Sequence, residues 1–388
     1  MTYHLKKSML LCLLAVVLTM ALLTPAVAEV APLTCGAWSV VSSANAESYN
    51  FLNGVAAVST SNIWAVGYSQ PNLGGPSQTL IERWNGTSWR VVSSPSPGSL
   101  LNLLNGVAAV SASNIWTVGL YFNGVYGQAL IEHWDGMNWS VITSPNPGAA
   151  GNGLNGVTVL SASNIWAVGS YSNTGNVGSS QTLIEHWDGT TWSVVTSPNV
   201  ASSGNDLVSV SAVSANNIWA VGNSFNNNTN SGKTLIEHWN GIRWSIVSSP
   251  SVGSFLNDLT GVVAISSHDI WAVGDSLSNT SPAKTLIEHW DGSKWSVISS
   301  PNVKSAYNVL NGVAAISSSN IWAAGYYNSS TFIEHWNGTR WSIASSPNVG
   351  SAGNLLNGVT NVPGTRDAWT VGFYNINGGT QTLTEFRC

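Results

Sequence analysis

Charged side chains are scarce in this chain. Asp, Glu, Lys and Arg make up 7% of its 388 residues, and the formal net charge at pH 7 is −5. No basic patch is present to neutralise phosphate groups, so a nucleic-acid partner is not expected. Surface polarity must come from Asn, Ser, Thr and Gly instead, and binding through such a surface should depend little on salt.

Motifs typical of catalysis and metal binding are also missing. The sequence has no nucleophile elbow, no zinc-ligand spacing and no Gly-rich phosphate loop. A sialidase-like enzyme would need a cluster of arginines with paired acids, and we find none. We therefore expect no enzyme, no cofactor and no metal site, with a hydrolase or lyase as the least favoured alternative.

Cysteine occurs three times, first as Cys12 in a segment typical of a secretory signal. A basic start and an apolar run precede Ala26-Val27-Ala28, which has the pattern of a cleavage site. We interpret residues 1–28 as a signal peptide and residues 29–388 as one secreted domain. The apolar run is short for a bilayer, so no membrane span is expected after signal removal.

Seven near-copies of one unit of about 50 residues fill the rest of the chain. The motif S-x-x-N-I-W-A-V-G carries one tryptophan in each copy: Trp64, Trp116, Trp166, Trp219, Trp271, Trp322 and Trp369. The motif T-L-I-E-H-W-[ND]-G carries one glutamate: Glu82, Glu132, Glu185, Glu237, Glu288, Glu334 and Glu385. The motif W-S-V-[VI]-[ST]-S-P carries a second tryptophan: Trp38, Trp89, Trp139, Trp192, Trp244, Trp295 and Trp341.

Each copy is expected to form four short strands, which we call strands a to d. Examples are 104–111 for strand a, 164–169 for b, 182–187 for c and 192–197 for d. The strands are rich in Val, Ile, Trp and Thr, whereas Gly, Asn, Ser and Pro separate them. Between strands c and d lies Asn-Gly or Asp-Gly, which tolerates the positive φ of tight hairpins.

Four antiparallel strands per repeat predict an all-β fold, a seven-bladed β-propeller. The third motif occurs once before any complete unit, at Trp38, and the chain stops just after the second motif, at Glu385. We therefore expect the N-terminal strand d to join the C-terminal blade and close the ring. An open solenoid is the rival, but it would need atypical capping repeats.

The two cysteines outside the signal segment fit this closure. Unit alignment puts Cys35 and Cys388 at adjacent positions of the one c–d turn that the chain cannot make covalently. A disulfide there is our prediction, and two free thiols are the alternative.

The repeated Glu-His pair, as in Glu132-His133, is the most obvious candidate for chemistry. Neighbouring residues on a strand point to opposite faces, so the pair cannot easily converge on one metal ion. We favour a structural role in which Glu fills a polar slot between blades and accepts hydrogen bonds from indole N–H or Ser and Thr hydroxyl groups. The tryptophans are expected to pack blade against blade.

The b–c and d–a loops vary most between copies, and most Tyr and Phe lie in or beside them. Rings stack on sugar C–H faces, and the same mixture of rings, amides and hydroxyls serves protein recognition. The ligand-binding candidates are Tyr68, Tyr121, Tyr126, Tyr171, Phe225, Tyr326, Tyr327 and Tyr374. The alternative is that these rings merely extend strand b and pack.

Three acids near the variable loops, Asp206, Asp258 and Asp275, are isolated in the sequence. Each is a possible contact for a cation or another ligand. Single carboxylates in turns are more often caps or turn residues, so we do not assign them to a site.

The framework N-I-W-A-V-G … L-I-E-H-W-N-G-x-x-W-S-V-V resembles tectonin-type propeller repeats, which place a W-x-V strand before a W-x-G-x-x-W hairpin. That family includes lectins and proteins that bind microbial surfaces, so the resemblance implies binding rather than catalysis. We predict a secreted, non-catalytic protein that binds carbohydrate through its b–c/d–a loop face. A protein-interaction scaffold or a structural surface protein is the alternative.

Overall fold

The computed structural model describes residues 35–174, 179–200, 204–350 and 352–388. These residues form 28 strands and no helix. Within the same ranges there is therefore no helical segment with the length and apolarity of a membrane span. Residues 34–388 make one structural unit, and the predicted signal peptide at 1–28 lies outside the described residues.

The strands recur in the predicted order a, b, c, d. Strands a are β2 (Tyr49–Ser59), β6 (Asn102–Ser111), β10 (Gly151–Ser161), β14 (Gly204–Ser214), β18 (Leu256–Ser266), β22 (Asn308–Ser317) and β26 (Asn354–Asn361). Strands b are β3 (Asn62–Gln70), β7 (Asn114–Phe122), β11 (Asn164–Ser172), β15 (Asn217–Asn226), β19 (Asp269–Ser278), β23 (Asn320–Tyr327) and β27 (Ala368–Ile376).

The outer strands complete each unit. Strands c are β4 (Gln78–Trp84), β8 (Gly127–Trp134), β12 (Gln181–Trp187), β16 (Ser231–Trp239), β20 (Ser281–Trp290), β24 (Ser330–Trp336) and β28 (Gly379–Arg387). Strands d are β5 (Trp89–Val91), β9 (Trp139–Ile142), β13 (Trp192–Val194), β17 (Trp244–Ile246), β21 (Trp295–Val297), β25 (Trp341–Ala344) and β1 (Ser39–Val41). We number the units one to seven by their strands a.

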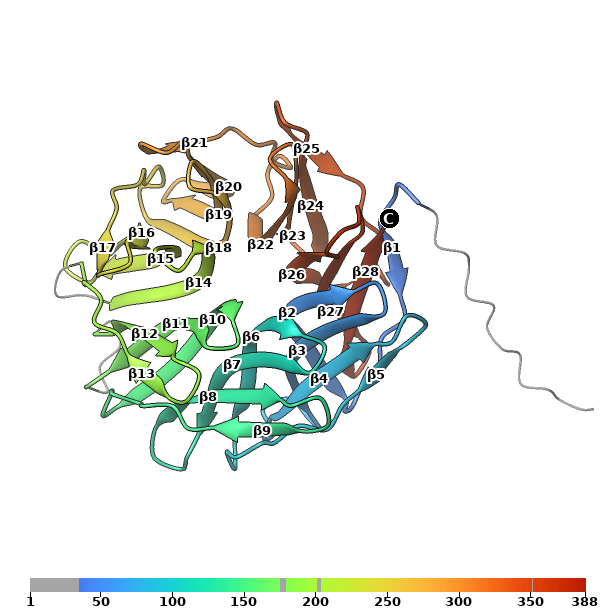
Figure 1. The fold of residues 1–388 in the computed structure, drawn as a ribbon. Coiled ribbons are helices and arrows are strands. Elements are labelled where there is room, and N and C mark those ends of the chain that lie inside the picture. The colour runs from blue at the N-terminus through green and yellow to red at the C-terminus, as the bar shows by residue number, and fades with distance from the viewer. Residues whose placement is uncertain (1–34, 175–178, 201–203, 351) are drawn as a thin grey trace, which may run out of the picture. The chain divides into compact units, whose positions relative to one another are not determined.

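Within each unit the four strands pair in antiparallel order a-b-c-d, and in unit seven strand d is β1. Ser39 to Val41 pair with Phe386 to Thr384, so the prediction for the N-terminal strand is confirmed. Units one and seven also share one parallel bridge, between Tyr49 and Thr380, which links their strands into an eight-stranded sheet. Figure 1 shows the sheets following one another around a common axis, with blue β1 beside red β28.

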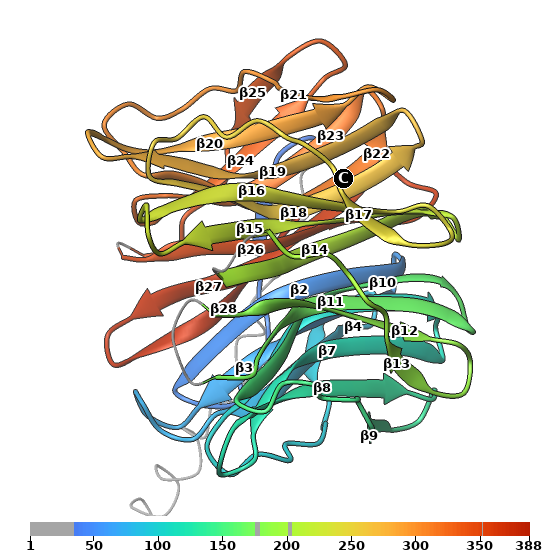
Figure 2. The same cartoon turned by 90° about the vertical axis from the view of Figure 1, so that its left-hand side faces the viewer.

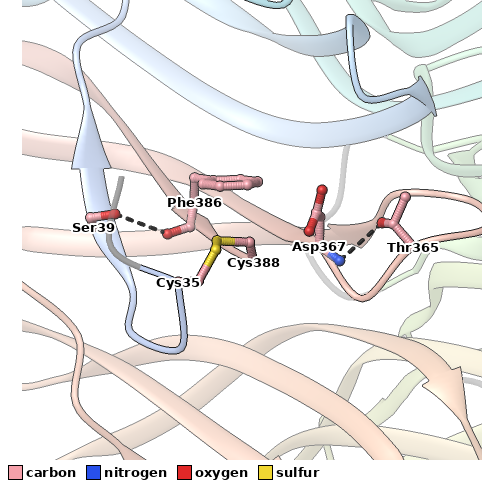
Figure 3. The surroundings of a disulfide bond; sticks show 6 residues. All are labelled: Cys35, Ser39, Thr365, Asp367, Phe386 and Cys388. Atoms are coloured by element: carbon pink, nitrogen blue, oxygen red, sulfur yellow. Dashed lines mark hydrogen bonds between the residues drawn. A yellow bond between two sulfur atoms is a disulfide. The ribbon is translucent and has the colours of Figure 1, made fainter. Parts of the chain in front are cut away.

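A disulfide joins Cys35 to Cys388, as predicted, across a sequence separation of 353, with 4.8 Å between their Cα atoms. Figure 3 shows the bond beside the β1–β28 pair, where Ser39 Oγ donates a hydrogen bond to the carbonyl of Phe386. Gly36 N also donates to the carbonyl of Cys388, at 3.1 Å. The disulfide and these bonds together take the place of the covalent c–d turn of the other units.

The turn chemistry explains the regular hairpins. The glycine of each covalent c–d turn has φ between +91° and +102°, a conformation that side chains rarely adopt. The residue before it caps the turn: Asn85 Oδ1 accepts from the backbone N–H of Thr87 and of Ser88, both at 2.9 Å. Seen from the side, in Figure 2, the strands run across the molecule and the connections gather at its two edges.

Apolar clusters lie between successive sheets, as predicted for the tryptophans. Trp116 of unit two packs with its ring centre 5.0 Å from that of Trp187 and 5.6 Å from that of Trp192, both in unit three. The same arrangement joins the two ends of the chain, where Trp369 of unit seven lies 5.3 Å from Trp89 of unit one. Each sheet is therefore buried on both faces.

The predicted strand limits need correction. Strands a and c begin slightly earlier than expected, at Asn102 and Gln181 instead of Leu104 and Thr182. Strand b was expected to end at Gly169 but reaches Ser172, because Tyr171 pairs with Asn152 on one side and Gln181 on the other. Strand d was expected to reach Ser197 but ends at Val194. Ser197 turns back to strand c, where its hydroxyl lies 2.7 Å from that of Thr182.

Candidate functional site

The two side chains of each Glu-His pair lie in different environments, because neighbouring residues of a strand point to opposite faces of the sheet. The histidine lies half-buried on the strand-b tryptophan: His133 is 4.3 Å from the Trp116 ring, and its Nε2 is 3.0 Å from Asn114 Oδ1. Arg83 occupies this position in unit one, stacked on Trp64, and Phe386 occupies it in unit seven, on Trp369. A position that accepts His, Arg and Phe is a packing position.

The glutamate side chain is fully buried in every unit. Ser144 donates to Glu185 at 2.8 Å, and Ser346 donates to Glu385 at 3.0 Å, in each case from the preceding unit. Of the two kinds of donor expected, the hydroxyl groups are found at Glu185 and Glu385, whereas no indole N–H donates to a glutamate among the hydrogen bonds of the described residues. The strand-c indole donates instead to an a–b turn, as Trp84 does to the carbonyl of Thr60.

Burial dominates the electrostatics of these glutamates. Desolvation raises the pKa of Glu132, Glu288 and Glu385 to about 8, and the Ser144 hydroxyl holds that of Glu185 at about 7. Within the described residues no three His, Cys, Asp or Glu side chains form a group that could hold a metal ion. The repeated acids therefore belong to the packing between units.

A second repeated feature lines the axis. Side chains of strands a donate to the carbonyl of the leucine in the next unit, over 2.6 to 3.0 Å: Asn53 to Leu104, Asn105 to Leu154, Asn155 to Leu207, Thr260 to Leu310, Asn311 to Leu356 and Asn357 to Leu52. The last bond runs from unit seven back to unit one. The six donor side chains line a cavity of about 500 Å³, and Asp206 and Val208 are among the residues that unit four contributes to it.

On the b–c/d–a side of this cavity, the residues at two positions of the unit differ from copy to copy. Each strand a carries a variable residue just before its buried leucine, and each strand b carries the Cα partner of that residue just after its glycine. We call these positions the channel belt. They are Phe51, Tyr68, Leu103, Leu120, Gly153, Ser170, Asp206, Asn223, Asp258, Asp275, Val309, Tyr326, Leu355 and Phe373, all of them partly exposed.

Contacts within the belt run between units as well as within them. Phe51 stacks on Tyr68 of its own unit at 4.6 Å and meets Phe373 of unit seven edge-on at 4.9 Å. A Cβ placed on Gly153 of unit three would lie 3.4 Å from the Leu120 side chain of unit two. Strand a of one unit thus meets strand b of the preceding unit.

The belt has an acidic arc in units three to five. Asp206 accepts a hydrogen bond from Asn155 at 3.2 Å and another from Ser170. Burial raises the pKa of Asp206, and burial with the nearby Asp206 charge raises that of Asp258. Burial with the Asp258 charge raises the pKa of Asp275 to about 7. The three carboxylates are therefore close enough to repel one another.

The rest of the belt is an apolar arc. It runs through units six, seven, one and two and consists of Val309, Tyr326, Leu355, Phe373, Phe51, Tyr68, Leu103 and Leu120. The two arcs meet at Tyr326, whose pKa is raised by burial and by the charge of Asp275. The seven pairs at this level of the sheets therefore differ in chemistry from unit to unit, with acidic pairs in some units and apolar pairs in others.

The predicted ligand-binding residues separate in the structure. Tyr68 and Tyr326 lie in the belt. Four other tyrosines pack against the clusters between units, as the alternative interpretation expected: Tyr121, Tyr171, Tyr327 and Tyr374. Phe225 pairs with Gly232 near the far end of β15, and Tyr126 is 45% exposed in the b–c turn before β8.

The acids were assessed wrongly from the sequence. Asp206, Asp258 and Asp275 are not isolated turn residues, because they lie in β14, β18 and β19 and because the charge of Asp206 acts on Asp258 and that of Asp258 acts on Asp275. When the units are aligned, Asp206 and Asp258 occupy the position of Phe51, and Asp275 occupies the position of Tyr68. This variation at fixed positions of the repeat is the sequence signal that identifies the belt. Asp269, which replaces the usual Asn in unit five, has the structural role of that Asn and accepts from the Trp271 indole at 2.7 Å.

Comparisons with known proteins identify the architecture. No family profile matches the chain, and no curated protein matches it. Among solved structures, one described as YCF48 bound to D1 peptide is similar, with 13% identity and a TM-score of 0.56 over 92% of this chain and 98% of that chain. At that identity the likeness concerns the fold alone. The chain therefore has an all-β, β-propeller fold with repeated blades.

Proposed function

We propose that the seven units close into one seven-bladed ring and act as a secreted, non-catalytic binding protein. The β1–β28 pair and the Cys35–Cys388 disulfide support the closure. So does the bond from Asn357 to the carbonyl of Leu52, which continues the hydrogen bonds around the axis. The disulfide also favours an oxidising compartment outside the cytosol, in line with the signal sequence pattern at residues 1–28.

The ligand is a carbohydrate, bound at the channel belt, and the protein belongs with tectonin-like lectins. One observation carries this proposal: the sequence keeps the framework of every unit constant but varies all seven pairs around the mouth of the channel. A packing framework needs no such variation, whereas a single asymmetric site built from identical units does. The cavity beneath the belt, about 500 Å³, lies in the range of small-ligand sites.

The chemistry of the two arcs suits a sugar. The rings of Tyr68 and Tyr326 offer flat apolar surfaces to sugar C–H groups. The carboxylates of Asp258 and Asp275 accept hydrogen bonds from hydroxyl groups, and the Asn223 amide both donates and accepts. In keeping with a sequence that carries no catalytic motif, we propose that this site binds its ligand and does not act on it.

A peptide partner is the second candidate. It is favoured by one finding, that a solved structure with the same fold is described as bound to a peptide. The amphipathic belt also suits a peptide side chain, so the experiment must separate the two ligand classes.

The test is a glycan-array screen of the protein expressed with its own residues 1–28 and purified from the secreted fraction. We expect saturable binding that free sugar competes away. Tyr326→Ala should weaken binding about 10-fold or more, because it removes a stacking ring from the belt. Tyr126→Ala is the matched control, since Tyr126 is exposed on the same side but lies outside the belt.

Two results would contradict the proposal. Folded protein that binds no glycan would remove the carbohydrate assignment and leave a protein partner as the leading account. Binding that is lost in Tyr126→Ala but kept in Tyr326→Ala would move the site from the belt to the b–c loops.

A further inference from the structure

The last serine of the third motif lies at the junction between neighbouring units. We call it the junction serine, and its copies are Ser43, Ser94, Ser144, Ser197, Ser249, Ser300 and Ser346. In five units its hydroxyl lies 2.6 to 2.7 Å from that of the strand-c threonine: Ser43 with Thr382, Ser94 with Thr79, Ser197 with Thr182, Ser249 with Thr234 and Ser300 with Thr285. In units two and six it donates instead to the buried glutamate of the next unit, Glu185 or Glu385.

Unit two shows what decides between the two arrangements. Its strand c carries Ala129 where unit one carries Thr79, and the backbone confirms the match. The Ala129 N–H donates to Asn146 Oδ1 at 2.7 Å, just as the Thr79 N–H donates to Ser96 Oγ at 3.0 Å. Because Ala129 has no hydroxyl, the junction serine of unit two has no partner on its own strand c and donates to the next glutamate.

Unit six shows that a unit with a threonine can also adopt the second arrangement. The Thr331 hydroxyl donates to the carbonyl of Pro347 at 3.2 Å, and the junction serine Ser346 donates to both carboxylate oxygens of Glu385, at 3.1 and 3.0 Å. The same three residue types therefore occur in two hydrogen-bonding arrangements within one chain. The strand-c threonine and the next glutamate compete for the serine.

No charged side chain contributes to the pKa of Glu132 or Glu185 from the elements packed against them. Burial alone raises the pKa of Glu132, so Arg83 and Arg90 in the preceding unit and His133 beside it have no part in the shift. For Glu185 the influences are burial and the hydroxyl of the junction serine. Hydroxyl groups are thus the means by which the protein adjusts these acids.

The charge of the glutamate determines how much it gains from a hydroxyl donor. A hydrogen bond to an ionised carboxylate is roughly twice as strong as one between neutral groups. Glu132 accepts no hydrogen bond from the described residues while Ser94 is bonded to Thr79. The hydroxyl pair is within reach of the next glutamate, since Ser300 lowers the pKa of Glu334 against the larger effect of burial.

We propose that the junction serine is a proton-linked switch between units. It bonds to the threonine of its own unit while the next glutamate is protonated, and it turns to donate to that glutamate when the carboxyl group ionises. Each switch adds a hydrogen bond across a junction at the moment when the buried charge needs a donor. Ala129 fixes the junction of units two and three in the glutamate-bonded arrangement. This inference does not depend on the ligand of the protein.

The test is Thr79→Ala, which gives unit one the residue that unit two has naturally. The chain has nine glutamates, so NMR of protein labelled at the Glu side-chain carboxyl carbon follows each titration, and Glu132→Gln assigns one signal. We expect Thr79→Ala to increase the acid dissociation constant of Glu132 about 10-fold, because Ser94 is free to donate to the carboxylate. Thr79→Ser is the matched control, since it keeps the competing hydroxyl and should leave the constant unchanged.

Two further variants assign the effect to the serine. In a Ser94→Ala background, Thr79→Ala should leave the Glu132 constant unchanged, because the donor is gone. Ala129→Thr makes the opposite change in unit two and should decrease the dissociation constant of Glu185 about 10-fold. Circular dichroism verifies that each variant folds, and Ala129→Thr tests the switch independently if Thr79→Ala does not fold.

Three results would overturn the switch. A folded Thr79→Ala variant with an unchanged Glu132 constant would show that the threonine does not compete for Ser94. An equal increase with and without Ser94 would show that the threonine acts on Glu132 by another route. A Glu185 constant that Ala129→Thr leaves unchanged would remove the explanation of the arrangement in unit two.

Discussion

At the residue scale, one motif serves two kinds of packing. The glutamate of the Glu-His pair is buried between sheets, and the histidine beside it covers the strand-b tryptophan at the edge of the sheet. Alternation along a strand separates neighbours in this way, and it places the two side chains of a pair that resembles a catalytic dyad in different environments. The buried carboxyl groups instead make stability depend on pH.

We predict that the protein is more stable at pH 5 than at pH 8. Burial raises the pKa of Glu288 from 4.5 to about 8, so the folded state holds a proton that the unfolded state releases above pH 4.5. The stability is complete below the unfolded pKa and is lost as pH rises through the folded pKa. Each such glutamate contributes a slope of about 1.4 kcal/mol per pH unit across that window.

Urea unfolding of the wild type and of Glu288→Gln at the two pH values measures this effect. Gln resembles the protonated acid and does not titrate, so the variant should lose less stability on going to pH 8. Asp291→Asn is the control, because the pKa of Asp291 lies at about 2 and that residue stays ionised throughout. Equal wild-type stability at pH 5 and pH 8 would argue against neutral buried glutamates.

At the element scale, a bulge in strand a determines how strands a and b approach. The register shifts between Leu154 and Gly156, and the backbone carbonyl of Gly153 then comes close to Gly169 of strand b. A Cβ on Gly169 would lie 2.0 Å from that oxygen. The glycine of N-I-W-A-V-G is therefore required by close backbone contact rather than by a turn.

Gly169→Ala should accordingly destabilise the protein by about 3 kcal/mol or more, because backbone atoms cannot move aside as a side chain can. Gly153→Ala is the control in the neighbouring strand, since its Cβ would make an ordinary 3.4 Å contact with Leu120. Chemical denaturation compares the two variants. Similar, small losses in both would mean that the bulge relaxes more easily than its geometry indicates.

At the scale of the whole molecule, the ends of the chain meet in one unit. Trp38, just before β1, packs edge-on against Trp322 of unit six, with 5.4 Å between the ring centres. The corresponding tryptophans of the other units make the same contact with the unit before them. Non-covalent pairing of β1 with β28 covers three residues only. The disulfide adds a covalent link at this short pair.

We predict that removing the disulfide lowers the free energy of unfolding by about 4 to 5 kcal/mol, because a loop of this length contributes large chain entropy to the unfolded state. The comparison is the wild type against the double variant Cys35→Ser/Cys388→Ser, by urea denaturation. Adding reductant should reproduce the loss in the wild type and leave the double variant unchanged. No effect of reductant on the wild type would show that non-covalent contacts alone hold the ends.

Much of the fold could be predicted from the sequence. The position of Trp38 ahead of the first complete unit predicted the pairing of β1 with β28, and the alignment of Cys35 with Cys388 predicted the disulfide. The candidate site was only partly predicted. Tyr68 and Tyr326 were named, but with Tyr121 and Tyr171, which pack between sheets. Successive residues of strand b point to opposite faces of the sheet, so a ring that lies one residue further along the strand points to the other face.

The sequence by itself determined the unit, its strand order and the pairing of the N-terminal strand with the C-terminal one, because these follow from local periodicity and turn chemistry repeated seven times. The tertiary structure alone decided which variable residues meet. Asp206, Asp258 and Asp275 lie in separate strands, and Phe51 and Phe373 lie near opposite ends of the chain. The arrangement of the sheets around one axis brings these positions close together, and no local pattern in the sequence encodes how far apart they lie in space.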